Sequence, residues 1–426
     1  MRLGRLTPAV LGITLYSMAR GLAIPAFRVL LPLYMLSVGY RTQDLGPMAT
    51  IASAATAALL PLVGRAVDSG WARWVGTSSG LLVAASLLIP WASHTYAALT
   101  LAYALAVLGM MVWQPARSAV TVAEVGPAAL GRAFTGFSAA FTISRIASPL
   151  IAVWLAGAVG YVKAMAAFSA VAVAGAAAFH TLSRGFRQRP RAGGRPRGGG
   201  LRAALLGTYA RAFRLVRSEP MILLFAILDR FGWTLWLPML NAYLKEACGL
   251  GNEGVGLFNS IFAAAMLATF YPVGRFADRA GPLKTLFLNE VVGAAATSLL
   301  ILTYFGSPAT AFVAGFVMGV SVELWIAGFN TLTTLLRGPE RVGEVRTGID
   351  SARMLASIPA PSVGSALYSL CGPTAPFTAG VALLIAAASS IASLAREREA
   401  VAQHAARAKQ VCRVGGEAGF KPARGG

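Results

Sequence analysis

The chain has 426 residues, of which 56% are hydrophobic and only 12% are charged. Soluble domains carry about 25% charged residues, so this composition excludes an ordinary water-soluble enzyme or binding module. The formal net charge of +21 would suggest nucleic-acid binding in a soluble protein, but in so apolar a chain the positive charge first reports on membrane orientation.

Twelve apolar stretches are long enough to cross a membrane as helices, since about 20 residues span a hydrocarbon core of roughly 30 Å. Prolines inside several of them are tolerated, because neighbouring helices satisfy the backbone groups that a proline frees. We therefore predict an all-α polytopic membrane protein. In chain order the helices are expected near residues 8–38, 43–66, 73–92, 96–121, 131–157, 161–182, 220–246, 253–276, 283–304, 308–336, 345–370 and 374–395.

Lys and Arg are unevenly distributed between the two sides of these helices. With the N-terminus inside, 28 of the 37 Lys and Arg residues lie in inner segments and three lie in outer loops. The positive-inside rule then places both termini in the cytoplasm and requires an even number of spans. Most of the net charge is thus an orientation signal, and we expect a multi-pass protein of the cell membrane.

The segment between the sixth and seventh helices, residues 183–219, is strongly basic. Its first half is rich in Arg, Gly and Pro, which predicts a disordered linker. In its second half Leu205, Tyr209 and Phe213 recur at helical spacing among arginines, the pattern of a basic amphipathic helix on the inner leaflet. Because basic inner loops are the rule in membrane proteins, we expect no nucleic-acid partner. Residues 396–426 are predicted to be a disordered cytoplasmic tail.

Two short segments repeat at a fixed distance. VGRAVDSGWARW (residues 63–74) and VGRFADRAGPLK (residues 273–284) share Val, Gly, Arg and Asp at positions 210 residues apart. The same offset pairs Arg20 with Arg230, and the fifth and eleventh helices match at an offset of 212. Two six-helix bundles, residues 1–182 and 220–395, would therefore be parallel repeats, as in duplicated transporters.

The second of these segments resembles the loop signature of the major facilitator superfamily, G-x-x-x-D-R-x-G-x-x-[KR]. Together with twelve helices, the central linker and the repeat, the resemblance covers residues 8–395. It implies the fold of that superfamily. The residues of the second copy that carry it are Gly274, Arg275, Asp278, Arg279, Gly281 and Lys284.

The first copy of the signature is degraded. It has Ser69 where the pattern requires Arg, and its turn is one residue shorter. The residues that remain are Gly64, Arg65, Asp68 and, after the shorter turn, Arg73.

The resemblance implies that the second helix meets the eleventh and that the fifth meets the eighth. Asp68 and Asp278 would then dock on the starts of the eleventh and fifth helices, whose positive N-termini compensate a carboxylate. Gly64 and Gly274 would let the backbones approach closely. We expect the two loops to act as an inner latch, made when the inner side is closed. A solvated turn that only orients the chain is the plainer alternative.

Ten ionisable residues lie inside the predicted helices, where a charge costs at least a few kcal/mol. The resemblance implies that the first, fourth, seventh and tenth helices line a central cavity. On that basis four of the ten stand out as site candidates. The ten are Arg20, Arg28, Arg117, Arg145, Asp229, Arg230, Glu290, Glu323, Asp350 and Arg353, and the four are Arg20, Asp229, Arg230 and Glu323.

The remaining intramembrane charges receive plainer interpretations. Asp350 and Arg353 are spaced as a local ion pair on one helix. Glu290 and Arg117 lie near enough to the inner helix ends for their side chains to reach the membrane surface.

Acids and arginines predict different roles in the candidate site. A buried carboxylate can gain and lose a proton, so Asp229 and Glu323 are the proton-coupling candidates, with a static Asp229–Arg230 pair as the alternative. Arginine stays charged, so Arg20, Arg145 and Arg230 can only bind anions or hold carboxylates. Trp233 and Asn330 complete the candidate site.

The leading interpretation is a secondary active transporter that moves a small organic solute by alternating access, coupled to protons. Six arginines against four acids within the helices favour an anionic solute. A proton/drug antiporter is the alternative. Against it, Leu105 stands four residues before Gly109 where antiporters carry Arg, and Ser148 departs from their Gly-Pro motif.

A membrane-embedded enzyme or a lipid scramblase is the alternative from a different class. The sequence contains no HExxH, G-x-x-x-x-G-K-[ST] or G-x-S-x-G motif, which argues against hydrolase or nucleotide chemistry. Its three Cys and three His are scattered, so we expect neither a metal nor a cofactor. We further expect the protein to be a monomer. Cys248 and Cys371 fall at predicted outer helix ends, which leaves a disulfide between them open.

Overall fold

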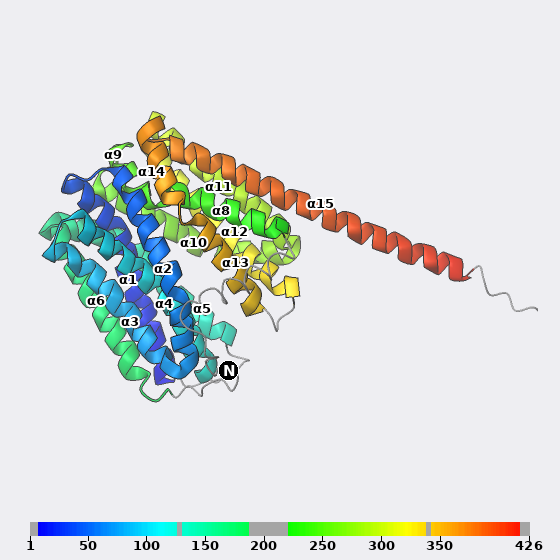
Figure 1. Cartoon of the computed structure of the whole chain (residues 1–426), viewed down its shortest axis with the longest axis horizontal. Helices are drawn as coiled ribbons and strands as arrows, with labels where there is room; N and C mark the ends of the chain where they lie inside the picture. Colours follow the sequence, from blue (N-terminus) through cyan, green and yellow to red (C-terminus); the bar gives the residue numbers. More distant parts are fainter. Residues whose placement is uncertain (1–6, 126–129, 187–219, 338–341, 418–426) are drawn as a thin grey trace, which may run out of the picture.

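The computed structural model describes residues 7–125, 130–186, 220–337 and 342–417, and these residues form helices without any strand. The linker helix that the sequence predicts lies outside them. Two helical bundles follow one another along the chain and pack side by side (Figure 1).

The N-terminal bundle contains six helices. Thr7 caps the first by accepting a hydrogen bond from the Val10 N–H (3.3 Å), and Thr95 caps the fourth in the same way from Ala98 (3.4 Å), because a threonine oxygen satisfies a free N–H of the first turn. The first helix lies against the fifth and sixth, and the third lies between the fourth and sixth. The helices are α1 (Pro8–Ser37), α2 (Leu45–Ala66), α3 (Ala72–Ala92), α4 (Tyr96–Glu124), α5 (Leu130–Val159) and α6 (Tyr161–Leu182).

The C-terminal bundle repeats this arrangement with two interrupted spans. Pro238 lies in a 3-10 turn (η4, Leu237–Met239) within its first span, and Pro359 lies at the break in its fifth, because a proline removes a backbone donor that a continuous helix needs. The helices are α8 (Pro220–Trp236), α9 (Leu240–Glu246), α10 (Asn252–Ala280), α11 (Pro282–Phe305), α12 (Ala309–Arg337), α13 (Val342–Ser357), α14 (Ala360–Cys371) and α15 (Ala375–Glu417).

Eleven stretches of the described residues are long and apolar enough to cross a membrane. The longest, Thr42–Ala92, contains both α2 and α3, which are joined by a kinked segment (Val67–Trp71) where Gly70 has a φ of 95°. Separating these two helices gives twelve membrane helices in two six-helix repeats. Their observed bounds agree closely with the predicted ones up to the last helix.

The last helix is longer than the sequence predicts. A disordered tail is expected from residue 396, but α15 stays helical to Glu417 and projects well beyond the bundle (Figure 1). Residues 397–414 contain neither Pro nor Gly and are rich in Ala, Arg and Glu, which are good helix formers, so their local sequence favours the helix up to the two glycines, Gly415 and Gly416, that come just before its end.

The two ends of the molecule differ. We call the end with the connections α1–α2, α5–α6, α9–α10 and α14–α15 the closed end, and the end where α1 begins, α6 ends and α8 begins the linker end. Across the two bundles α2 contacts α13 and α14, and α5 contacts α10. These are the helix pairs that the family resemblance implies.

Candidate functional site

Three arginines converge from the two bundles. Arg28 of α1 interacts electrostatically with Arg145 of α5 and with Arg230 of α8. Arg28 and Arg230 are solvent-exposed although each lies well inside a membrane helix. Their neighbours belong to helices of both bundles, so this exposed surface faces the region between the bundles and not the lipid.

Two of these arginines use weak hydrogen-bond acceptors. Arg28 Nη2 donates to the Met110 sulfur (3.4 Å), and Arg145 Nη1 donates to the Met266 sulfur (3.2 Å). Arg145 also lies over the Phe262 ring, 4.7 Å from its centroid. Thioether sulfur is among the weakest acceptors in proteins, and neither guanidinium group has a carboxylate within 4.0 Å among the described side chains. Most of their donors are therefore available to an anion.

Glu323 of α12 faces this arginine group from the C-terminal bundle. Its side chain is buried and interacts electrostatically with Arg145 of the opposite bundle, at a distance beyond an ion pair. Asn330 lies half-buried further along α12. The structure thus places Glu323 and Arg145, two predicted site residues, on facing sides of the boundary between the bundles.

Two asparagines continue from this region toward the closed end. Asn241 Nδ2 donates to the Arg28 carbonyl oxygen (2.9 Å), and Asn259 Nδ2 donates to Asn241 Oδ1 (2.8 Å). Because the Asn241 bond joins the two bundles, it holds the backbone of α1 next to the arginine group.

Arg20 has a different environment from its repeat mate Arg230. It is only 8% exposed, donates from Nη2 to the Met110 carbonyl oxygen (3.1 Å) and lies 5.5 Å from the Trp113 ring centroid. All these contacts are within the N-terminal bundle. Arg20 therefore joins α1 to α4 and interacts electrostatically with Arg117 of α4, but the structure does not bring it to Arg28, Arg145 and Arg230.

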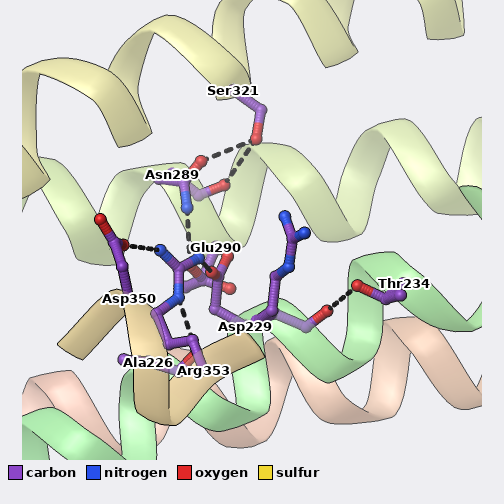
Figure 2. Close-up of polar contacts among 9 residues, drawn as sticks. Ala226, Asp229, Thr234, Asn289, Glu290, Ser321, Asp350 and Arg353 are labelled. Carbon is purple, nitrogen blue, oxygen red and sulfur yellow. Dashed lines mark hydrogen bonds and ion pairs between the residues drawn. The ribbon is translucent and has the colours of Figure 1, made fainter. Parts of the chain in front are cut away.

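A second group of charges lies inside the C-terminal bundle (Figure 2). Asp229 of α8 and Glu290 of α11 are each 1% exposed, and Arg353 of α13 is 7% exposed. Arg353 Nη2 lies 2.5 Å from Asp229 Oδ2, and its Nε donates to the Ala226 carbonyl oxygen (3.1 Å). The side chains of Asp229 and Glu290 interact directly with each other. Three helices thus contribute one residue each to a buried group of two acids and one base.

Polar neighbours orient this buried group. Asn289 Nδ2 donates to Glu290 Oε1 (2.6 Å), and Ser321 of α12 donates to Asn289 Oδ1 (2.8 Å). Asp350 lies 3.6 Å from Arg353 on the same helix. Glu290 is therefore held in place from the side that faces α12.

Two interpretations from the sequence are wrong for this group, and one is confirmed. Glu290 does not reach the membrane surface but is buried against Asp229. The local ion pair predicted between Asp350 and Arg353 is confirmed at 3.6 Å, and Arg353 makes a second, shorter ion pair with Asp229. The static Asp229–Arg230 pair, which was the alternative to a proton-coupling role, is not among the ion pairs of the described residues, because Asp229 pairs with Arg353. Sequence spacing could not find the partner, because 124 residues separate Asp229 from Arg353, although the adjacent polar residues Asn289 and Glu290 were a usable signal.

Trp233 packs within the C-terminal bundle. Its ring lies 5.2 Å from that of Trp236, and a Cβ at Gly293 of α11 would come 3.0 Å from it. Its observed contacts are those of a core residue that joins α8 to α11.

The two signature loops share a backbone feature that explains their second glycine. Gly70 in the first copy and Gly281 in the second both have positive φ, 95° and 80°, a conformation that glycine adopts at no steric cost. At each place one helix ends and the next begins. The one-residue shift between Gly70 and Gly281 accounts for the shorter turn of the first copy.

The latch residues themselves face open space. Asp68 and Asp278 are exposed, and neither has an ion pair among the described residues. A Cβ at Gly64 or Gly274 would meet no atom within 4 Å, so the close backbone approach expected there is not made in this conformation. Arg65, Arg275, Arg279 and Lys284 are likewise exposed.

Arg73 is bound inside its own bundle. Its Nε donates to the His180 carbonyl oxygen (3.1 Å), and its Nη2 lies 2.6 Å from His180 Nε2. Thr77 holds the other ring nitrogen of His180 at 3.0 Å. Arg73 thus joins α3 to α6 and does not extend toward Asp68.

The contacts that join the bundles gather toward the closed end. The backbone N–H of Thr42 donates to Glu246 Oε2 (3.1 Å), and its hydroxyl donates to the same oxygen. Ser362 Oγ donates to Thr50 Oγ1 (2.8 Å), and Asn252 of α10 donates to the Tyr161 hydroxyl (2.8 Å). These bonds close one end of the molecule, while the signature loops at the other end lie apart.

Known proteins share this architecture. A mutant of the nucleoside transporter NupG is similar to the chain with a TM-score of 0.72 and 14% identity, covering 90% of this chain and 99% of that one. The peptide transporter POT in complex with alafosfalin is similar with a TM-score of 0.71 and 14% identity, covering 93% and 96%. No curated protein matches the chain significantly.

A bacterial homologue of the human lysosomal transporter Spinster, in an inward-facing and unoccupied conformation, is similar with a TM-score of 0.64 and 13% identity, covering 90% and 95%. At such identities the likeness shows the fold alone. The sequence model of the Major Facilitator Superfamily matches residues 9–361 and 222–423. The chain, with its two six-helix repeats, therefore belongs to the major facilitator superfamily of membrane transporters.

Proposed function

We propose that the protein carries a small organic anion across the cell membrane by alternating access, in exchange with or together with protons. The observation that carries this proposal is the convergence of Arg28, Arg145 and Arg230 between the two bundles. Three cations in a membrane interior repel one another, and an anion bound among them would relieve that repulsion.

The hydrogen-bond partners of these arginines support an anionic solute. Arg28 and Arg145 each donate to a methionine sulfur, whereas a carboxylate or phosphate oxygen would form charge-assisted bonds about twice as strong as neutral ones. An anion that reaches both residues would therefore displace the two sulfurs. The arginines are already oriented by Met110 and Met266, so binding needs little rearrangement.

Alternating access is supported by the unequal ends of the molecule. The closed end is joined by Thr42–Glu246 and Thr50–Ser362 contacts, while Gly64 and Gly274 at the linker end face open space. A rocking of one bundle against the other would break the first set and bring the signature loops together. We place the linker end and both termini in the cytoplasm and take the monomer as the transporting unit.

Coupling to protons is assigned to the acids of the C-terminal bundle. Glu323 faces Arg145 across the boundary, so a bound anion and the Glu323 carboxylate would compete for the same guanidinium group. Protonation of Glu323 would then favour anion binding, which links the two solutes.

Uptake into proteoliposomes tests this function. We expect saturable, pH-gradient-driven accumulation of one member of a panel of labelled organic anions, and loss of its binding in Arg28→Met. Arg41→Met, which removes an exposed arginine at the closed end, is the matched control. Transport of amphiphilic cations without any anion transport would favour a proton/drug antiporter. Lipid flipping without saturable solute flux would contradict a transporter altogether.

A further inference from the structure

The buried acid pair Asp229–Glu290 would carry two negative charges if both acids were ionised, but it is paired with one positive charge. The charged groups that face it are Arg353 of α13 at 2.5 Å, Arg230 of α8, and Asp350, which lies 3.6 Å from Arg353. Arg230 is exposed toward the region between the bundles, and Asp350 is 48% exposed at its side chain. Inside the bundle, therefore, two buried carboxyl groups share one guanidinium group.

The hydrogen bonds of the pair leave one carboxyl oxygen of each acid without a partner. Asp229 Oδ2 is paired with Arg353, and Glu290 Oε1 accepts from Asn289 at 2.6 Å. The other oxygen of each side chain, Asp229 Oδ1 and Glu290 Oε2, is buried with no hydrogen-bond partner among the described residues. Buried polar atoms are nearly always satisfied. Two adjacent carboxyl groups with one lone oxygen each are satisfied together by a single proton between them.

We propose that Asp229 and Glu290 form one proton-binding site, in which a proton held on Glu290 Oε2 is donated to Asp229 Oδ1 while Asp229 Oδ2 stays paired with Arg353. In this state each oxygen of the pair has a partner, and the group carries no net charge. Asn289 fixes which oxygen of Glu290 faces the aspartate, because its amide nitrogen donates to Oε1.

Release of this proton to water would leave two carboxylates against one guanidinium group. Like charges in a shared buried site cannot both ionise freely, so the second carboxylate would draw Arg353 away from its bond to the Ala226 carbonyl oxygen. Arg353 belongs to α13, which is separated from α14 at Pro359 and contacts α2 of the other bundle. The protonation of the acid pair would thereby act on a helix that borders the linker end.

The site is separate from the arginine group between the bundles. Asp229 and Glu290 are each 1% exposed, whereas Arg28 and Arg230 are open to solvent. A solute that reaches the arginines would not touch Glu290. Glu290 is therefore a proton-binding residue that does not contact substrate, and its link to transport rests on the function proposed above.

Infrared spectroscopy of the purified full-length protein tests the shared proton without any transport assay. We expect a protonated-carboxyl C=O band at neutral pH that shifts in D₂O and is lost in both Glu290→Gln and Asp229→Asn. Glu253→Gln, which changes an exposed glutamate on α10, should retain the band, as should Glu323→Gln. Absence of a protonated carboxyl group from the wild-type protein at neutral pH overturns the proposal, so the test does not depend on any variant folding.

Transport provides the second arm of the test. Glu290→Gln keeps a hydrogen-bond donor toward Asp229 and imitates the protonated state, so we expect solute exchange at near wild-type rate with proton-driven accumulation lowered at least tenfold. Glu253→Gln should accumulate solute normally. Undiminished accumulation by Glu290→Gln would overturn the coupling role of the pair. If no solute is transported at all, the proposed function fails while the infrared band still decides whether the proton is shared.

Discussion

Gly46 of α2 lies directly against Pro361 of α14, so that a Cβ at position 46 would come 2.3 Å from the Pro361 carbonyl oxygen. Gly256 of α10 lies in the same way against Pro149 of α5, at 3.2 Å. The two glycines are 210 residues apart and the two prolines 212, the offsets of the internal repeat. The duplication has therefore produced one glycine–proline contact on each side of the boundary between the bundles.

Gly46→Ala should open the closed end. The added methyl group would meet a backbone carbonyl that cannot rotate away, so α2 and α14 must separate. We expect a maleimide to label a cysteine placed at Thr50, which contacts Ser362, several times faster in the Gly46→Ala background.

Two further substitutions sharpen this prediction. Gly256→Ala should have a smaller effect, because its nearest neighbour is the Val153 side chain at 2.7 Å, which can adjust. Gly157→Ala in α5, where a Cβ meets nothing within 4 Å, should leave labelling unchanged. Equal labelling in all three backgrounds would contradict a tight α2–α14 contact.

Glu246→Ala should weaken the closed end through lost hydrogen bonds. Glu246 Oε2 accepts both the N–H and the hydroxyl of Thr42, and bonds to a charged group contribute about 1.5–3 kcal/mol. A change of that size shifts the balance between conformations by roughly tenfold or more. Spin labels at the exposed positions Lys163 and Leu370 would report a longer separation, while Glu253→Gln would leave the distance distribution as it is.

Arg28→Met and Arg20→Met should have opposite consequences. Arg28 is exposed and bonded to a sulfur, so we expect its loss to weaken anion binding at least tenfold with little change in the melting temperature. Arg20 is buried over Trp113, so its loss should lower the melting temperature and leave the dissociation constant of the folded protein nearly unchanged. Binding titrations and thermal unfolding measured on the same samples separate the two, and a reversed pattern would place the anion at Arg20.

Asp278→Asn should slow transport more than Asp68→Asn. The second signature copy retains Arg279, whereas the first has Ser69 in its place and its Arg73 is held by His180. We therefore predict that the second latch is the stronger one. Initial rates of uptake should fall more in Asp278→Asn at an unchanged dissociation constant. Equal losses would contradict a stronger second latch, and unchanged rates in both variants would show that the loops serve only to orient the chain.

Of the two cysteines at the closed end, only Cys371 should react with a thiol reagent in the native protein. Both Cys248 and Cys371 are free in the structure, with Cys248 buried and Cys371 exposed. Burial raises the pKa of the Cys248 thiol, which lowers its reactivity further, because the thiolate is the reactive form. Mass spectrometry after maleimide treatment would show modification at 371 but not at 248, and a linked pair of peptides would contradict two free thiols.

Apolar length and charge distribution were sufficient to predict the twelve helices, the matched segments 210 residues apart indicated the two repeats, and the family resemblance implied which helices pair between them. A membrane helix satisfies its own backbone hydrogen bonds, so about 20 apolar residues determine one locally. The predicted end of the last helix, at residue 395, was too early, because the residues beyond it are not apolar. The sequence beyond residue 395 is polar, and polarity alone does not tell a solvent-exposed helix from a disordered tail.

The candidate site depended on tertiary structure. The list of intramembrane charges was complete in the sequence, but which acid meets which base is set by helix rotation and by contacts between distant residues. Asp229 pairs with Arg353 and not with its neighbour Arg230, because adjacent residues on a helix point about 100° apart. For the same reason Glu290 turned inward to Asp229, and Arg28 toward the space between the bundles. The sequence by itself determined that these charges lie within the membrane helices, and only the packing of those helices decided their partners.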